Sequence, residues 1–209
     1  MDEILHILPQ AWSGEPIVHR GPIYDLPSVG VRPTPPRRIP VLIGGGAEPA
    51  IRRAARLADG IFANAPAEKF VAQVGWVLDE CERIGRDPAD FRFLHYSILL
   101  PGPSRAEALA SYRDALWALQ WKYSDMEASA TRSLPPRVPP SFDGPDEDLT
   151  TGRATYAGTS DEIVEALLEI REQAGVPVEF VARSHLPLLA YDAQVDLMGL
   201  LAEGIAPHV

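Results

Sequence analysis

Three consecutive glycines stand between a short apolar run and a helical stretch in the segment PVLIGGGAEPAIRRAARLADG, which begins at Pro40. Glycines remove the side chains that would keep a ligand from the backbone. The helix that follows presents unpaired N–H groups and the positive end of its dipole. This combination is typical of a phosphate cradle, and its candidate residues are Gly44, Gly45, Gly46 and Ala47. A plain turn is the alternative, because Pro49 breaks the dinucleotide-binding pattern and no Gly-Lys-Ser/Thr follows.

A histidine lies within the apolar segment FRFLHYSILL, residues 91–100. Strand alternation places His95 and Ser97 on one face and Tyr96 and Ile98 on the other. The second face is the more apolar, so we expect it to meet the covering helices. His95 and Ser97 would then face the interior, where ligands bind at the carboxyl ends of the strands. The alternative for His95 is a hydrogen-bonded core histidine.

Two further candidates for contact with substrate or cofactor end predicted strands. Arg183 closes the run VEFVAR, and its guanidinium could pair with a phosphate or a carboxylate or could brace the following loop. Asn64 ends the run IFAN at the same rim. The sequence shows no His/Cys cluster with metal-ligand spacing and no nucleophile elbow, so it predicts no metal site and no particular catalytic residue.

The elements that must position these residues alternate along the chain after residue 40. Apolar runs predict strands at 41–43, 61–65, 91–100 and 178–183. Amphipathic or capped segments predict helices at 49–57, 67–85, 104–123, 159–175 and 190–207. Alternation of this kind indicates an α/β fold with parallel strands joined by helical crossovers. Residues 12–40 are rich in proline and glycine and allow only short edge strands, such as two pieces around Gly21-Pro22.

Composition narrows the class of protein. The chain has 209 residues, of which 46% are hydrophobic, and no apolar run approaches a membrane span. A net charge of -10 argues against nucleic-acid and anionic-membrane partners. The single cysteine, Cys81, cannot form an internal disulfide, so we expect a cytoplasmic protein.

Three blocks carry a resemblance to a known family. GEPIVHRGPIYDL, PTPPRRIPVLIGGGAEPAIRRAARLADGIF and YAGTSDEIVEALLEIREQAGV, in this order, resemble the later half of the bacterial-luciferase-like family. These proteins are flavin- or deazaflavin-dependent oxidoreductases, including monooxygenases, built on a (β/α)8 TIM barrel. The resemblance implies that the backbone of Gly44–Ala47 binds a cofactor phosphate, that the cofactor is FMN or the deazaflavin coenzyme F-420, and that the substrate is a small molecule.

The resemblance also implies that the first four strands of such a barrel have no counterpart here. We therefore expect residues 1–209 to form one luciferase-like domain that is incomplete at its N-terminus, with a Pro/Gly-rich insertion at 12–40 and strand-helix repeats at 41–209. The chain could be a catalytically inactive fragment or an assembly subunit. It could also complete its barrel with a second copy or with a partner chain. An unrelated α/β enzyme that binds a phosphate sugar is the remaining alternative.

Overall fold

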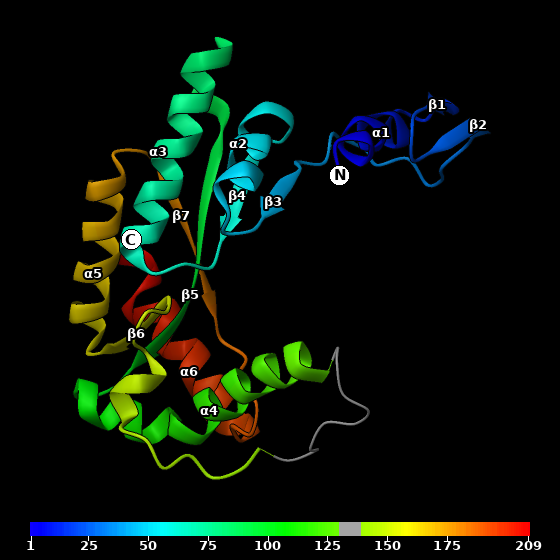
Figure 1. Cartoon of the computed structure of the whole chain (residues 1–209). Coiled ribbons are helices and arrows are strands. Elements are labelled where there is room, and N and C mark those ends of the chain that lie inside the picture. Colours follow the sequence, from blue (N-terminus) through cyan, green and yellow to red (C-terminus); the bar gives the residue numbers. More distant parts are fainter. Residues whose placement is uncertain (130–138) are drawn as a thin grey trace. The chain divides into compact units, whose positions relative to one another are not determined.

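A computed structural model of the chain describes residues 1–129 and 139–209 (Figure 1). The chain divides into two compact units. Unit 1 comprises residues 1–63 and 72–94, and unit 2 comprises residues 64–71 and 95–209. Residues 133–152 are rich in proline and aspartate, so the sequence predicts a long loop there, and this loop lies partly outside the described residues. Among the helices of the described residues, none has the length and apolar character needed to cross a membrane.

The N-terminal part of unit 1 contains one helix and a strand pair. Helix α1 (Asp2–Ser13) precedes β1 (Ile17–Arg20) and β2 (Asp25–Val29), which pair antiparallel. This pair confirms the two short strands that the proline-rich segment allowed. The Glu3 carboxylate ties α1 to the intervening turn, because it accepts hydrogen bonds from the N–H groups of Ile23 at 3.2 Å and Tyr24 at 3.0 Å.

The glycine segment of unit 1 forms a strand, a helix and a second strand. Strand β3 (Leu42–Gly44) pairs in parallel with β4 (Gly60–Ala63), and α2 (Glu48–Leu57) connects them. The predicted strand and helix are confirmed, and the apolar face of α2 is buried at Ile51, Ala54 and Ala55. Asp59, just before β4, holds the residue that precedes β3, since its carboxylate accepts a hydrogen bond from the Val41 N–H at 2.7 Å.

A buried carboxylate braces α2 against α3 (Ala67–Ile84). Glu80 is 2% exposed and accepts hydrogen bonds from Arg56 at 2.7 Å and from Arg83 at 3.0 Å. The Arg52 guanidinium lies 3.6 Å from the same carboxylate. The hydrogen bonds from Arg83 and Arg56 outweigh burial and lower the pKa of Glu80 to about 2. The spacing of the apolar residues in α3 predicts one buried stripe, and the structure confirms it, since Phe70, Val74, Val77 and Cys81 are all buried.

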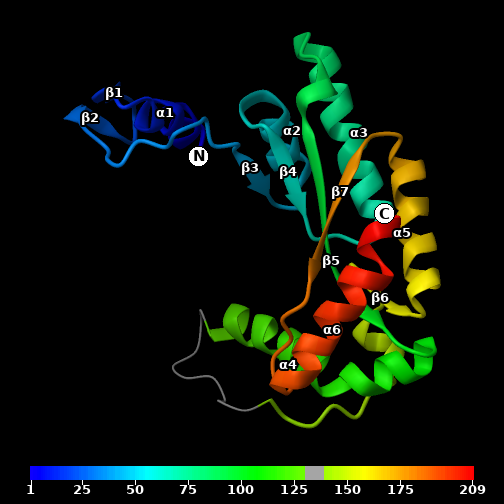
Figure 2. The ribbon, with the colours of Figure 1, turned by 180° about the vertical axis from the view of Figure 1, so that it is seen from behind.

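Three strands meet in unit 2. Strand β5 (Arg92–Pro101) starts in unit 1 and continues through unit 2, where it pairs in parallel with β6 (Thr155–Gly158) and also pairs with β7 (Val178–Arg183). Figure 2 shows β7 running beside β5. The reading of four strands after residue 40 is therefore wrong by one. β6 has only four residues next to a helix cap, and its pairing with β5, Ile98 opposite Thr155, is what makes it a strand.

Helices cover these strands of unit 2. Helix α4 (Arg105–Ser129) contacts β6, while α5 (Ser160–Ala174) contacts β6, β7 and α6 (Tyr191–Gly204). The predicted capping box of α5 is present at Thr159 and Glu162, and Gly175 ends the helix in the left-handed conformation. Short 3-10 helices complete the described part of the chain at Pro88–Asp90, Asp146–Leu149 and Ala206–His208.

Candidate functional site

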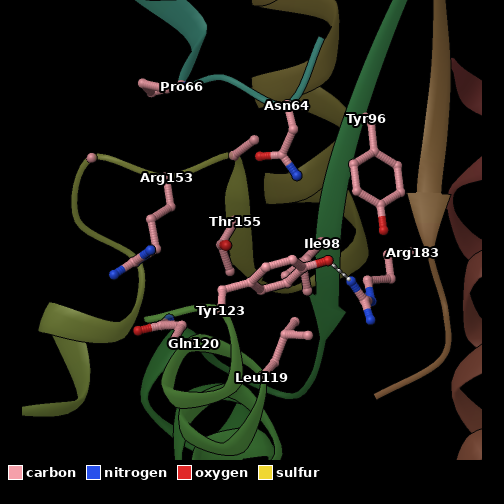
Figure 3. A pocket seen from close by; sticks show the side chains of 12 residues that line it. Asn64, Pro66, Tyr96, Ile98, Leu119, Gln120, Tyr123, Arg153, Thr155 and Arg183 are labelled. Carbon is pink, nitrogen blue, oxygen red and sulfur yellow. Dashed lines mark hydrogen bonds between the residues drawn. The ribbon is translucent and has the colours of Figure 1, made fainter. Parts of the chain in front are cut away.

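A pocket of about 420 Å³ opens in unit 2 beside β5, β6 and β7 (Figure 3). This volume lies within the range of small-molecule sites. Its polar lining includes Asn64 and Arg183, two of the residues predicted from the sequence. The remaining lining residues are Pro66, Tyr96, Ile98, Leu119, Gln120, Tyr123, Gly152, Arg153, Ala154 and Thr155. The pocket thus combines apolar walls with two arginines and two phenols, and no acidic side chain of residues 1–129 and 139–209 lines it.

Arg183, at the end of β7, is held in place by neutral oxygens. Its Nε donates a hydrogen bond to the His185 carbonyl at 3.0 Å. Its Nη1 donates a second hydrogen bond to the Tyr123 hydroxyl at 3.5 Å, which is the dashed line in Figure 3. Burial lowers the pKa of Arg183, but its contacts with the hydroxyls of Tyr123 and Tyr96 oppose burial, and the net direction is upward. Arg183 therefore remains a cation with restricted orientation.

His95 lies on the other face of β5 from Tyr96 and Ile98, which line the pocket. It is fully buried, its Nε2 donates a hydrogen bond to the Ala65 carbonyl at 3.0 Å, and its ring meets the Phe70 ring edge-on at 4.8 Å. Burial lowers the pKa of His95, and the hydrogen bond to Ala65 only partly opposes it. The orientation expected from the sequence is thus reversed, and a contact between His95 and a ligand stays a prediction.

The reversal has a physical reason. Counting apolar side chains assigned Tyr96 and Ile98 to the helix-covered face, but the polar end of Tyr96 lies beside Arg183 (Figure 3). Ser97 is likewise fully buried. A backbone carbonyl and aromatic neighbours accommodate His95 in the core. The alternation along the strand was right, whereas the hydrophobic count chose the wrong face.

The glycine loop belongs to unit 1. β3 ends at Gly44, and Gly45 has a φ of 141°, a conformation that side chains disfavour. Ala47 is the N-cap of α2 in an extended conformation and provides no side-chain cap. The first-turn carboxylate of Glu48 is drawn to Arg52, whose Nε donates to it at 2.7 Å. The first-turn backbone of α2 is thus left without a capping side chain, as the hypothesis of a phosphate cradle requires.

Several pocket residues were not predicted. Tyr123 lies on the helix predicted at 104–123, where an aromatic residue favours packing over ligand binding, and Arg153 and Thr155 follow a segment without a periodic signal. The segment ATYAG, with its β-branched and aromatic residues directly before a capping box, was the signal that could have placed β6 and its neighbours. Among the described residues, no group of three or more His, Cys, Asp or Glu side chains could hold a metal ion.

Parallel strands covered by helices, with a ligand-sized pocket beside them, define an α/β protein. A sequence model described as luciferase-like monooxygenase matches residues 1–177, and the chain belongs to this family. An uncharacterised protein of Mycobacterium tuberculosis is 42% identical over 60 residues, which are 29% of this chain and 20% of that protein.

Solved structures of luciferase-like TIM-barrel proteins have a similar fold. The coenzyme F-420 dependent tetrahydromethanopterin reductase from Methanopyrus kandleri is 18% identical, with a TM-score of 0.64 over 99% of this chain and 62% of that one. A riboflavin lyase bound to modified FMN is 16% identical, with a TM-score of 0.64 over 97% of this chain and 56% of that one. The chain therefore spans less than two thirds of the length of these relatives.

Proposed function

We propose that this chain is the later half of a luciferase-like oxidoreductase whose FMN or deazaflavin coenzyme F-420 is bound through its phosphate by the backbone of Gly44–Ala47. The observation that carries the proposal is the junction of β3 and α2, where Gly45 is in a glycine conformation and Ala47 leaves the helix start without a side-chain cap. N–H groups at such a start favour a dianion. When bound, the reduced cofactor supplies the hydride or oxygen chemistry.

Space beside the loop also supports a bound phosphate. A methyl group added at Gly44 would lie 3.7 Å from the Phe62 carbonyl oxygen, and one added at Gly45 would lie 3.6 Å from Ala50. Neither position is blocked by the fold. The packing around residue 44 would accept a side chain, so it does not explain why this residue is glycine. A glycine here leaves the backbone uncovered, and a ligand can then approach it closely.

The test is titration of the chain with FMN and with coenzyme F-420 separately, followed by fluorescence or calorimetry. We expect one cofactor to bind and the variant Gly44→Ala to weaken it. Gly199→Ala, at an unobstructed position of α6, is the matched control and should bind normally. Failure of the unsubstituted chain to bind either cofactor contradicts the proposal. A sugar phosphate that raises the melting temperature while both cofactors leave it unchanged would favour a phosphate-sugar enzyme instead.

We further propose that strands from outside residues 1–209 complete the barrel, and that a second copy or a partner chain is one source of them. The matched structures are longer than this chain, and among the described strands β3 pairs only with β4, which leaves one edge of β3 open. Without those strands the chain by itself would be catalytically inactive. A monomer in light scattering that is active with bound cofactor would contradict this proposal.

A further inference from the structure

The pocket in unit 2 contains an arginine whose charge is not balanced by the protein. Arg183 is half-buried, and its hydrogen bonds go to the His185 carbonyl and to the hydroxyls of Tyr123 and Tyr96. No carboxylate among the described residues forms an ion pair with it. A partly buried cation that is bonded only to neutral oxygens still favours an anionic partner.

Other arginines of this chain are paired with carboxylates, whereas Arg183 has no such partner among the described residues. The chain carries 29 acidic and 19 basic side chains, and its arginines commonly find carboxylates. Arg56 lies 2.7 Å from Glu80, Arg105 lies 2.6 Å from Glu147, and Arg113 lies 2.6 Å from Asp146. In so acidic a chain, a half-buried arginine without a carboxylate partner marks a position where the counter-charge comes from elsewhere.

A second cation lines the same pocket. Arg153 precedes β6, and within the described residues its guanidinium forms no hydrogen bond or ion pair. It lies toward the β6 side of the pocket, whereas Arg183 lies toward β7 (Figure 3). Two cations without an acid produce a positive potential inside a strongly acidic chain, and that potential attracts anions.

The remaining walls indicate what else the ligand carries. Ile98, Leu119 and Pro66 are apolar, and the rings of Tyr96 and Tyr123 offer flat surfaces. The hydroxyl of Thr155 and the amide of Asn64 add a few polar groups. A volume of about 420 Å³ holds a molecule with an apolar or aromatic body and one charged end.

We propose that this pocket binds an acidic small molecule through its oxyanion, with Arg183 as the principal ligand-binding residue and Arg153 as a supporting charge. A guanidinium presents a planar fork of donors that matches a carboxylate or a phosphate. Both sources share this chemistry, and the experiment below separates them. That the anion is the substrate rests on the proposed oxidoreductase function. That the pocket binds an anion is independent of that function.

The experiment is calorimetric titration of the chain, without any flavin, with benzoate, phenyl phosphate and the neutral analogue benzamide. We expect at least one of the two anions to bind and benzamide to bind much more weakly. Tighter binding of benzoate assigns a carboxylate ligand, and tighter binding of phenyl phosphate assigns a phosphate. The variant Arg183→Gln should bind the anion about tenfold more weakly or worse, since it removes charge-assisted hydrogen bonds. Arg153→Gln should weaken it by a smaller factor.

Controls separate this inference from misfolding and from the cofactor proposal. Arg37→Gln removes one exposed positive charge from unit 1 at a residue that does not line the pocket, and this variant should bind the anion as the unsubstituted chain does. A matching circular dichroism spectrum and melting temperature establish that Arg183→Gln folds. Equal binding of benzoate and benzamide, no binding of either anion, or unchanged binding by Arg183→Gln overturns the inference. If the chain binds a flavin but no anion, this inference is wrong and the proposed function is unaffected. If the chain binds the anion but no flavin, only the proposed function is wrong.

Discussion

Replacing Gly45 by alanine tests the backbone conformation of the loop between β3 and α2. The φ of 141° at Gly45 belongs to a region that only glycine occupies readily. Holding a residue with a side chain there costs about 1–3 kcal/mol. The added methyl group would lie 3.6 Å from Ala50, an ordinary contact, so the entire cost comes from the backbone. That cost is a substantial part of the roughly 5–15 kcal/mol by which proteins are stable.

The assay for Gly45→Ala is urea unfolding followed by circular dichroism. With a slope of roughly 2 kcal/mol per molar urea, a loss of about 2 kcal/mol moves the midpoint down by about 1 M. Gly44→Ala is the matched control, because φ at Gly44 is outside the left-handed region and its methyl group would lie 3.7 Å from the nearest atom. We expect that variant to stay within about 1 kcal/mol of the unsubstituted chain. Equal stability of Gly45→Ala and Gly44→Ala would refute the reasoning.

Three further predictions use the same unfolding assay or a pH titration. Thr159→Ala removes the cap that accepts the Glu162 N–H and should cost about 1 kcal/mol, whereas Thr159→Ser should remain close to the unsubstituted chain. Because the pKa of Glu80 falls from 4.5 to about 2, its contribution to stability is present above pH 4.5 and is lost as the pH falls toward 2. The melting temperature of Glu80→Gln should therefore vary less over that range, and an unchanged pH dependence would argue against the ion-pair cluster. Burial lowers the pKa of His95 below 6.5, so its contribution is present above pH 6.5 and is lost on acidification, and an NMR titration of its ring should show protonation only below that value.

Local patterns along the chain determined most of the elements. Short-range rules of periodicity and capping predict three of them. These are helix α5 with its Thr159–Glu162 capping box and terminal glycine, the apolar stripe of α3, and the strand at 178–183. The family was also readable from the order of three sequence blocks, and the matched model over residues 1–177 confirms it. The elements depend on neighbours within a few residues, and the family depends on the order of blocks along the chain, which is why the sequence alone is sufficient for both.

Tertiary structure decided what the sequence alone left open. β6 is a strand because β5 supplies its hydrogen-bonding partner, and a four-residue run has too few positions to show a period. The burial of His95 and the exposure of Tyr96 to the pocket depend on which face of β5 the rest of unit 2 covers. The meeting of Arg153, Tyr123 and Arg183 in one pocket likewise joins residues far apart along the chain. Contacts of this range arise from packing, and no local pattern of residues encodes them.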